Sequence, residues 1–590
     1  MSFFCLFDIV GEAGLRNKPL IFVNLLVMRY WYRDKDYVYI GFNYNANFVN
    51  KMKRDFGAKY NPALKEWYFE PSLEKSQMLK YFLEGNGFKN EKPERQIEIP
   101  LKEIKSLVNE KELKEMFDYL GLPLHLRDYQ IEGVSYMVNH GNCLNGCGPG
   151  VGKTRQSIAL AELLNLFPCI VVCPATVKQS WVNEWKLCNP NRTVHVIDSK
   201  DETNTDWKAD VTVINYDYLF KRSAKEEGKK EVKLRYSRSL TKKWGLAVID
   251  EIHLCKNPKS IRSKCVQKIV ENAEKTIGLS GTAIMNRPQE LINILRILGR
   301  FKEIFPDSLY YLYRYCAAKK TRFGLVCTGA SCTMELNKVI KHYCYFRKEL
   351  RDVVNELPPI IKQTVNVPIT NKKEYRKAEK DFIEWLANID IEAAERAIRA
   401  EQLVRLSGLK KLSINGKIKF IIQFLKEWSE ANEDEKMIVF GITTDILERL
   451  GKEFKNSEVV TGKYGTEEKM RKVETWKKEK TFLFANIASL STGIDGLQKY
   501  CYNMAFIELP QRPAELEQAT GRIDRMGQTQ TMNVYFLLSS DTIDMQIREL
   551  LDGKIKVTDA VNKGIDVQVS RDDSMDIALI KKLKEWKEKK

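Results

Sequence analysis

This 590-residue sequence lacks two features: cysteine pairs with the CxxC spacing, and an apolar run long enough to span a membrane. Its 13 cysteines are scattered, and no two of them have the CxxC spacing. Several fall in short apolar runs, which indicates reduced thiols within a core rather than disulfides. Zinc could in principle be bound by Cys316, Cys327, Cys332 and Cys344, but the spacing is poor for a metal site. We therefore expect an intracellular protein that is not secreted.

The sequence also lacks any apolar run of membrane-spanning length. Residues 20–28 (LIFVNLLVM) are apolar, but the run is short, contains Asn24 and lacks a small-residue cleavage site. A signal peptide is therefore not expected. Met28 could be the true start of the chain. We expect no membrane partner.

Acidic residues are too few to balance the basic ones, and the formal net charge is +18. Such an excess favours a polyanionic partner, most often nucleic acid. The chain is 44% hydrophobic and 29% charged, which is ample for two to four domains with real cores. Composition alone does not identify the polyanion.

The most informative stretch is residues 143–156 (CLNGCGPGVGKTRQ), followed by an apolar, helix-like run over 157–167. A glycine-rich loop that opens a helix surrounds an anion with backbone N–H groups at the positive end of the helix dipole. Lys153 can reach the outer phosphates, and the Thr154 hydroxyl can bind magnesium. Cys147 stands where the strict pattern has glycine, so the looser GxGKT form fits better.

Short apolar runs alternate with helical segments in two parts of the chain. The runs lie at residues 169–173, 211–215, 246–250 and 276–280, and again at 437–440, 481–485, 504–508 and 533–537. This rhythm is typical of parallel sheets covered by helices on both faces. The expected fold class is α/β, with two RecA-like parallel-sheet lobes, a helical interlobe insertion and a small α+β N-terminal domain.

Composition shifts divide the chain further. The expected parts are an extension (1–27), an α+β domain (28–87), a linker (88–115), lobe 1 (116–300), an interlobe region (301–430), lobe 2 (431–556) and a basic tail (557–590). In the α+β domain, basic residues interleave with Tyr60, Trp67 and Tyr68, a mixture suited to nucleic acid. The aromatic residues could equally form the domain core. The basic insertion at 221–243 reads as a solvated loop, and contact with DNA is the alternative.

Asp250 and Glu251 end an apolar strand-like run, within VIDEIH. In an open parallel sheet, the carboxyl ends of the strands form the ligand crevice. Asp250 can hold magnesium there, and Glu251 can orient and deprotonate an attacking water. Farther along, Arg522 and Arg525 are three residues apart, on one face if that segment is helical. A guanidinium from an opposite lobe could neutralise charge developing on a transferred phosphate.

Further motifs follow in a fixed order: LRDYQ at 126–130, PAT at 174–176, LSGTA at 279–283, STGID at 491–495 and QATGRIDRMGQ at 518–528. With the glycine-rich loop and the acidic box, this set resembles the Swi/Snf family of superfamily-two helicase-type ATPases. The resemblance covers about residues 124–556, and the arginine motif is its most specific part. It implies ATP, with Mg²⁺, as the cofactor and DNA as the partner of a monomeric motor.

The resemblance also implies a role for each matching residue. The catalytic group is Lys153, Asp250, Glu251, Arg522 and Arg525. The nucleotide-binding group is Gln130, Gly148, Gly150, Gly152, Lys153, Thr154 and Arg155, with Gln130 reading adenine. Thr154 and Asp250 are the implied metal ligands. The group implied to contact DNA or couple it to hydrolysis is Thr176, His253, Ser280, Thr282, Thr492, Gly493 and Gln528.

Residues 346–353 (FRKELRDV) and neighbouring motifs are most similar to the annealing-helicase branch of that family. Residues 56–69 (FGAKYNPALKEWYF) are similar to the HARP domain that precedes the motor in this branch. The sequence departs from the family pattern at Cys147, at Ile252 and at the pair Gln511 and Arg512, the last of which lies in the expected second-lobe DNA contact. The expected function is an ATP-driven DNA translocase that remodels branched DNA. A strand-separating helicase and a DNA clamp switched by ATP remain alternatives.

Overall fold

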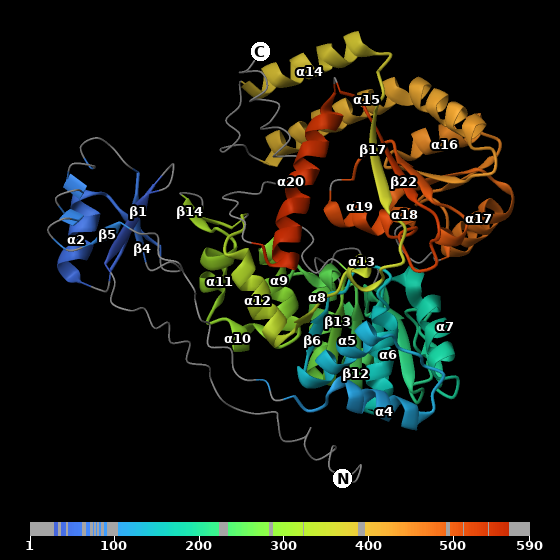
Figure 1. Ribbon diagram of the computed structural model, residues 1–590, viewed down its shortest axis with the longest axis horizontal. Helices are drawn as coiled ribbons and strands as arrows, with labels where there is room; N and C mark the ends of the chain where they lie inside the picture. Colours follow the sequence, from blue (N-terminus) through green and yellow to red (C-terminus); the bar gives the residue numbers. More distant parts are fainter. Residues whose placement is uncertain are drawn as a thin grey trace, which may run out of the picture.

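The computed structural model has three folded parts, which Figure 1 shows as a small domain beside two stacked α/β lobes. No described helix is long and apolar enough to span a bilayer. The structure describes residues 29–33, 37–42, 45–61, 66–70, 75, 78–79, 82–83, 86, 88–90, 104, 106–222, 234–281, 287–321, 324–327, 329–387, 396–490, 496–510, 512–540 and 542–565.

The N-terminal domain is a five-stranded sheet, in the order β3-β4-β2-β1-β5, with helix α2 beside it. Its elements are β1 (Tyr30–Arg33), β2 (Val38–Gly41), α2 (Ala46–Asp55), β3 (Lys59–Asn61), β4 (Glu66–Phe69) and β5 (Lys89–Asn90). Phe56, Trp67 and Phe69 are buried in its core, whereas 47% of Tyr60 is exposed. Trp67 is therefore part of the domain core, one of the two interpretations of this aromatic stretch, whereas Tyr60 is accessible to a ligand.

Lobe 1 is built on a seven-stranded parallel sheet in the order β16-β6-β13-β12-β7-β9-β8. The strands are β6 (Cys143–Asn145), β7 (Cys169–Cys173), β8 (Val194–Val196), β9 (Val211–Asn215), β12 (Trp244–Asp250), β13 (Ala273–Leu279) and β16 (Tyr345–Phe346). Its helices are α4 (Glu110–Leu120), α5 (Asp128–Asn139), α6 (Lys153–Leu163), α7 (Lys178–Cys188), α8 (Ile261–Glu271), α9 (Leu291–Ile297), α10 (Phe301–Ile304), α11 (Ser308–Tyr315) and α12 (Thr333–Tyr343). Apolar strands bury both sheet faces, as the sequence rhythm predicts.

Lobe 2 is a six-stranded parallel sheet in the order β17-β22-β21-β18-β20-β19. The strands are β17 (Ile360–Asn366), β18 (Met437–Gly441), β19 (Ser457–Val460), β20 (Phe482–Asn486), β21 (Asn503–Phe506) and β22 (Met532–Leu538). Its helices are α14 (Lys372–Ala387), α15 (Arg396–Ala431), α16 (Thr444–Glu453), α17 (Thr466–Glu479), α18 (Ile487–Leu490), α19 (Pro513–Thr520) and α20 (Ile543–Lys563). The two-lobe α/β fold expected from the sequence is confirmed.

The interlobe region is mostly helical, but its strands complete both sheets. β16 pairs with β6 of lobe 1, and β17 pairs along its full length with β22 of lobe 2. The short helix α13 (Leu350–Val353) and residues 354–359 connect them. The long helix α15 packs into lobe 2 through its apolar face. The region is therefore divided between the lobes, since it supplies one edge strand to each sheet.

The C-terminal helix α20 returns from lobe 2 to lobe 1, where it lies along α12 (Figure 1). Asn337 Nδ2 donates to the carbonyl oxygens of Val561 and Asn562, at 2.6 and 2.9 Å. The Tyr345 hydroxyl lies 3.2 Å from Asn562 Oδ1. Residues 557–563, expected to belong to a basic tail, are thus a structural contact between the lobes. The rest of the expected tail beyond residue 565 lies outside the described residues.

Lobe 2 is held together by a buried lysine. The Lys417 side chain is fully buried, and its Nζ donates to the Ile507 and Leu537 carbonyls at 2.8 and 3.1 Å. Its charge is paired with the Asp544 carboxylate at 2.6 Å, at the start of α20. One ammonium group therefore joins α15, the ends of β21 and β22, and the helix that crosses to lobe 1.

We predict that Lys417→Ala destabilises lobe 2 by about 3–5 kcal/mol, because removing one partner leaves a buried carboxylate unpaired. Urea unfolding followed by circular dichroism measures the loss. The control is Lys426→Ala. Lys426 lies on the same helix as Lys417, and the substitution breaks its exposed ion pair with Glu453 of α16. Its cost should stay below about 1 kcal/mol. Equal effects of the two variants would contradict the role assigned to Lys417.

Candidate functional site

The glycine-rich loop lies between β6 and α6, at the carboxyl end of the sheet. Gly150 and Gly152 have φ of +79° and +89°, a backbone region that side chains rarely adopt. A Cβ on Gly152 would also lie 2.1 Å from Gln130 Nε2. Glycine is therefore required at this position both for the turn and for the approach of Gln130.

Lys153 and Gln130 are both held against this loop. Lys153 Nζ donates to the carbonyl oxygens of Cys147 and Gly148, at 2.8 and 3.2 Å. Gln130 is buried, donates to the Val151 carbonyl at 3.0 Å and accepts from the Arg127 N–H at 3.0 Å. The ammonium and the amide thus converge on one loop although 23 residues separate them in sequence. A ligand that carries an anionic group close to a heterocyclic base could contact both the Lys153 ammonium and the Gln130 amide.

The two acids of the expected acidic box end β12. Glu251 has φ +53° and ψ +48°, a strained conformation for a residue with a side chain. Asp250 is half-buried, and its Oδ2 accepts from Trp181 Nε1 at 3.0 Å. Burial and the neighbouring Glu251 raise the pKa of Asp250. The Asp250 carboxylate is therefore held by a hydrogen bond, whereas the Glu251 carboxylate is positioned by a strained backbone turn.

Glu251 is surrounded by groups that favour its charged form. Burial opposes ionisation, but the hydrogen bond from His253 and the charges of Lys153 and Arg522 lower its pKa overall. His253 Nδ1 lies 3.1 Å from Glu251 Oε2 and 2.9 Å from Ser280 Oγ. His253 and Ser280 therefore connect the acidic box to the end of β13. The Glu251 carboxylate is therefore ionised at neutral pH, the state in which a general base must start.

The expected metal ligands are Thr154, in the first turn of α6, and Asp250. Both supply oxygen, the ligand type that Mg²⁺ prefers. No cluster of three or more His, Cys, Asp or Glu within the described ranges could hold a metal by itself. The donor set therefore fits an ion that takes its remaining ligands from water and phosphate oxygens.

The expected arginine motif begins at the end of α19, and Arg522 and Arg525 lie in the turns that follow this helix, so the expectation that a helix places them on one face is wrong. The motif faces the glycine-rich loop from lobe 2. A Cβ on Gly521 would lie 3.1 Å from Pro149 Cβ, so the lobes approach closely here. A Cβ on Gly150 would lie 3.7 Å from Arg525 Cγ. Arg522 is close enough to lower the pKa of Glu251 in the other lobe. The structure thus brings Arg522, Arg525, Glu251 and the loop into one cleft.

A segment that we call the seam segment, residues 345–351, runs along the back of this cleft. Its carbonyl oxygens at Phe346 and Lys348 accept from the N–H groups of Gly146 and Gly148, at 2.7 and 2.9 Å. The seam segment therefore extends the strand pairing of β16 beyond its last residue, alongside the glycine-rich loop. Movement of the seam segment must move the loop with it.

Arg347 is the buried charge of the seam segment. Its Nη1 donates to the carbonyl oxygens of Gly146 and Gly281, at 2.7 and 2.8 Å. Its Nη2 pairs with Glu349 at 2.5 Å and lies 3.9 Å from Glu517 of lobe 2. Burial raises the pKa of Glu517 to about 7, against the opposing charge of Arg347. Arg347 thus touches both loops of the cleft in lobe 1 and approaches lobe 2.

Arg351 makes the direct contact with the arginine motif. Its Nη2 and Nε donate to the two carboxylate oxygens of Asp524, at 2.7 and 3.1 Å. Asp524 lies between Arg522 and Arg525 in sequence. A bidentate pair fixes both distance and orientation. The seam segment therefore ties the arginine motif to the glycine-rich loop.

Other expected site residues are placed differently. Arg155 Nε donates to Glu184 of α7 at 2.5 Å, away from the loop. The Thr176 hydroxyl is buried after β7, with no hydrogen-bond partner among the described residues. Gln528 is buried, and its amide bonds to the Cys501 carbonyl and the Thr529 and Gln530 N–H groups. The structure therefore gives Gln528 a role in the lobe 2 fold rather than at the surface. Thr282, Thr492 and Gly493 lie outside the described residues.

Sequence reasoning missed the cleft roles of Arg347, Arg351 and Glu517. Residues 346–353 were noticed only as a branch resemblance, and their partners are far away in sequence. The available signal was the pair of arginines four residues apart just before the Pro358–Pro359 break. Their partners follow only from the folded structure.

Two family models match the chain in tandem. The SNF2-related domain matches residues 129–415, and the helicase conserved C-terminal domain matches residues 416–527. Together they span the glycine-rich loop, the acidic box, the seam segment and the arginine motif.

Curated relatives are similar over three quarters of this chain. The DNA annealing helicase and endonuclease ZRANB3 of Mus musculus is 24% identical over 74% of the chain and 41% of its own length. The SWI/SNF-related matrix-associated actin-dependent regulator of chromatin subfamily A-like protein 1 of Xenopus tropicalis is 25% identical over 77% of the chain and 46% of its own. The chain thus spans less than half the length of either relative.

One solved structure, the Sulfolobus solfataricus SWI2/SNF2 ATPase core domain, aligns with 80% of this chain and 93% of its own. Its sequence identity is 21% and its TM-score 0.34.

Proposed function

This chain belongs to the Swi/Snf family of superfamily-two helicase-type ATPases, and we propose that it hydrolyses ATP to translocate on DNA. The observation that carries the proposal is the cleft itself. Lys153 and Glu251 from lobe 1 meet Arg522 from lobe 2, and both Lys153 and Arg522 are close enough to lower the pKa of Glu251. Opposed lobes that complete one hydrolytic site only when closed are suited to a cycle of gripping and release.

The groups in the cleft divide the chemistry between them. Backbone N–H groups of the loop and the Lys153 ammonium bind the phosphates of ATP. Glu251 orients a water and takes its proton as the water attacks the γ-phosphorus. Arg522 or Arg525 neutralises the charge that develops on the γ-phosphate oxygens. His253, which is hydrogen-bonded to Ser280 and lies 3.1 Å from Glu251 Oε2, holds the general base in place.

Magnesium, when bound with ATP, would neutralise the phosphate charge and would be held by Thr154 and Asp250. The hydrogen bond from Trp181 orients the Asp250 carboxylate for that purpose. Asp250 must be ionised to bind a cation, and its raised pKa favours binding at neutral rather than acidic pH. The chain itself supplies the positioning of both ligands.

DNA as the track is supported by the net charge of +18. The curated relatives include an annealing helicase by name. We propose the same class of activity here, the remodelling of branched DNA. A strand-separating helicase is the second candidate.

The N-terminal domain is proposed to select the DNA structure. Tyr60 is exposed beside Trp67, with ring centroids 5.1 Å apart, and Lys53 lies over the Trp67 ring at 5.9 Å. An exposed ring backed by a cation is suited to stack on an unpaired base. The buried Trp67 would then support Tyr60 rather than contact DNA.

ATP hydrolysis with and without duplex DNA tests the proposed function. We expect strong stimulation by DNA in the wild type and almost none in Glu251→Gln, which still binds ATP because only water activation is lost. Glu271→Gln, which alters an exposed acid at the end of α8, is the control and should behave as wild type. Near-normal hydrolysis by Glu251→Gln would disprove the assigned base. Strand-displacement and annealing assays then separate the two DNA activities.

Substituting the finger arginine should affect turnover rather than binding. Arg522→Ala or Arg525→Ala should lower kcat by about 10³-fold, because the transition state loses charge stabilisation. Nucleotide affinity, measured with a fluorescent ATP analogue, should change far less. The arginine whose variant retains normal DNA-stimulated kcat is not the finger.

The Arg351–Asp524 pair should position the arginine motif. Arg351→Ala is expected to lower kcat by about tenfold or more with little change in KM, since a displacement of about 1 Å can cost about 10²-fold in rate. The exchanged pair Arg351→Asp with Asp524→Arg should recover part of the loss. The control is Lys463→Ala, which removes an exposed pair with Glu448 in lobe 2. Failure of the exchange to recover any activity would argue against a specific pair.

A further inference from the structure

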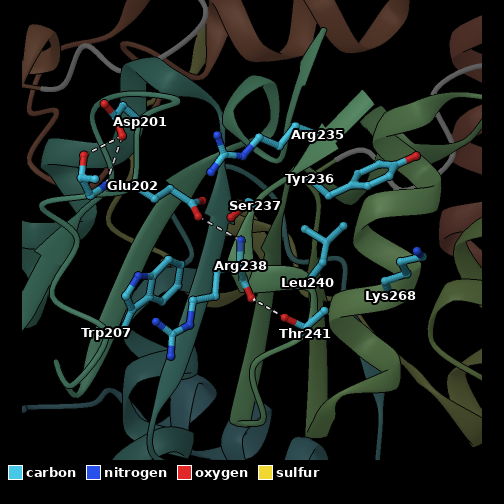
Figure 2. Close-up of a pocket in the computed structure, with 11 residues that line it drawn as sticks. Asp201, Glu202, Trp207, Arg235, Tyr236, Ser237, Arg238, Leu240, Thr241 and Lys268 are labelled. Atoms are coloured by element: carbon cyan, nitrogen blue, oxygen red, sulfur yellow. Dashed lines mark hydrogen bonds between the residues drawn. The ribbon is translucent and has the colours of Figure 1, made fainter. Parts of the chain in front are cut away.

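Lobe 1 contains a cavity of about 510 Å³ between the loop that joins β8 to β9, the described end of the basic insertion and helix α8. Figure 2 shows its walls. The loop after β8 contributes Glu202 and Trp207. The strand β11 (Leu234–Tyr236) and the residues that follow it contribute Tyr236 and Arg238, and α8 contributes Lys268. β11 pairs with β10 (Phe220–Arg222) in a hairpin.

Two of its walls pair a cation with an aromatic ring. The Arg238 guanidinium lies 5.6 Å from the centre of the Trp207 ring, and Lys268 Nζ lies 5.2 Å from that of Tyr236. In Figure 2 these pairs lie at opposite sides of the cavity. Tyr236 is 46% exposed. Rings and cations in one hollow are the combination that binds unpaired bases and their phosphates.

The surroundings carry an excess of positive charge. The described residues of the basic insertion, 221–222 and 234–243, contain six Lys or Arg and no Asp or Glu. Lys242 also lies over Trp207, at 5.9 Å, and burial together with the nearby Arg238 lowers its pKa. Neighbouring cations repel one another, and an anion that binds between them relieves this repulsion. A phosphate is such an anion.

The acids of the cavity are not equivalent. Asp201 accepts from the Thr203 N–H and hydroxyl, so it is already used within its loop. Glu202 Oε2 accepts from the Arg238 N–H at 2.9 Å. Its Oε1 is buried with no hydrogen-bond partner in the described part of the chain. An unmet acceptor is costly, and the amino group of a base would satisfy it, whereas a peptide carboxylate would be repelled.

The cavity adjoins the expected DNA-backbone motif. Lys178, two residues after Thr176, donates to the Ile197 carbonyl at 3.2 Å and pairs with Asp198 at 2.5 Å. Those partners begin the loop that leads to Glu202 and Trp207. Lys178 therefore links the expected DNA-backbone motif to the loop that lines the cavity.

We propose that this cavity binds a nucleotide of an unpaired DNA strand, as a site separate from the duplex path of the motor. The phosphate lies between Arg238 and Lys268, and the base stacks on Tyr236 or Trp207. Stacked bases inside a duplex cannot offer their faces to these rings, so the cavity favours single strands. The inference rests on the proposed function for DNA as the ligand, but it needs no hydrolysis.

Fluorescence anisotropy without nucleotide tests the site, using a labelled 20-nucleotide single strand of mixed sequence and a blunt 20-base-pair duplex. Tyr236→Ala should weaken single-strand binding by about fivefold or more, which corresponds to about 1 kcal/mol of stacking. Duplex binding should stay within about twofold. Tyr236→Phe keeps the ring and should bind as wild type.

A charge variant tests the phosphate contact. Lys268→Gln should reduce the slope of log affinity against log salt by about 0.7 for the single strand. Lys264→Gln changes an exposed lysine one turn earlier on α8 and outside the cavity, so it should leave the slope unchanged. Identical slopes for both variants would overturn the phosphate contact.

Equal weakening of single-strand and duplex binding by Tyr236→Ala would overturn the site, as would unchanged single-strand binding. These outcomes are distinct from failure of the proposed function. A wild type that binds DNA without DNA-stimulated hydrolysis would refute the translocase and leave the cavity intact. Normal DNA-stimulated hydrolysis together with a failed cavity test would refute the cavity and leave the translocase intact.

Discussion

The buried guanidinium of Arg347 is the contact on which the cleft depends. It is 6% exposed, and it bonds to carbonyl oxygens from the ends of β6 and β13 and to Glu349. A buried charge costs several kcal/mol unless its donors are satisfied, so these partners are held together. Because Glu517 of lobe 2 lies 3.9 Å away, the same charge is sensitive to how closely the lobes approach. The loop that binds phosphate is therefore not independent of the opposite lobe.

Much of this arrangement could be predicted from local sequence. Residues 169–173 and 211–215 were expected as strands and form β7 and β9 with those bounds. The glycine-rich loop, the acidic box and the arginine motif each carry their chemistry in a few adjacent residues. Because parallel strands all present their carboxyl ends at one edge, strand-end motifs necessarily meet there. The convergence of Lys153, Asp250 and Glu251 follows from that rule.

What could not be predicted depends on pairs distant in sequence. Arg351 and Asp524 are 173 residues apart, and neither has a local pattern that names its partner. Gln528 fits the arginine motif, yet its amide is used by the turn after it, because a buried side chain must satisfy its own donors and acceptors. Trp67 lies in a basic, aromatic stretch, yet alternation along β4 points it into the core. In each case burial decides the role, and burial is a property of the fold.

The sheet order sets a further constraint on how DNA and ATP can influence each other. β6, which leads into the glycine-rich loop, lies near one edge of the lobe 1 sheet, whereas β8, whose following loop lines the proposed single-strand cavity, lies at the other. Helix α7 spans this distance through side chains. Its Lys178 contacts the loop that leads to the cavity, its Trp181 donates to Asp250, and its Glu184 pairs with Arg155 of α6.

These three residues of α7 are spaced three apart, so they lie along one face of a rigid element. A strand that displaced Lys178 from Asp198 would shift the start of α7. The same helix orients the Asp250 carboxylate, so that shift would reach the acid expected to hold magnesium. A contact at one edge of the sheet can in this way alter the hydrolytic centre while the strands between them stay fixed.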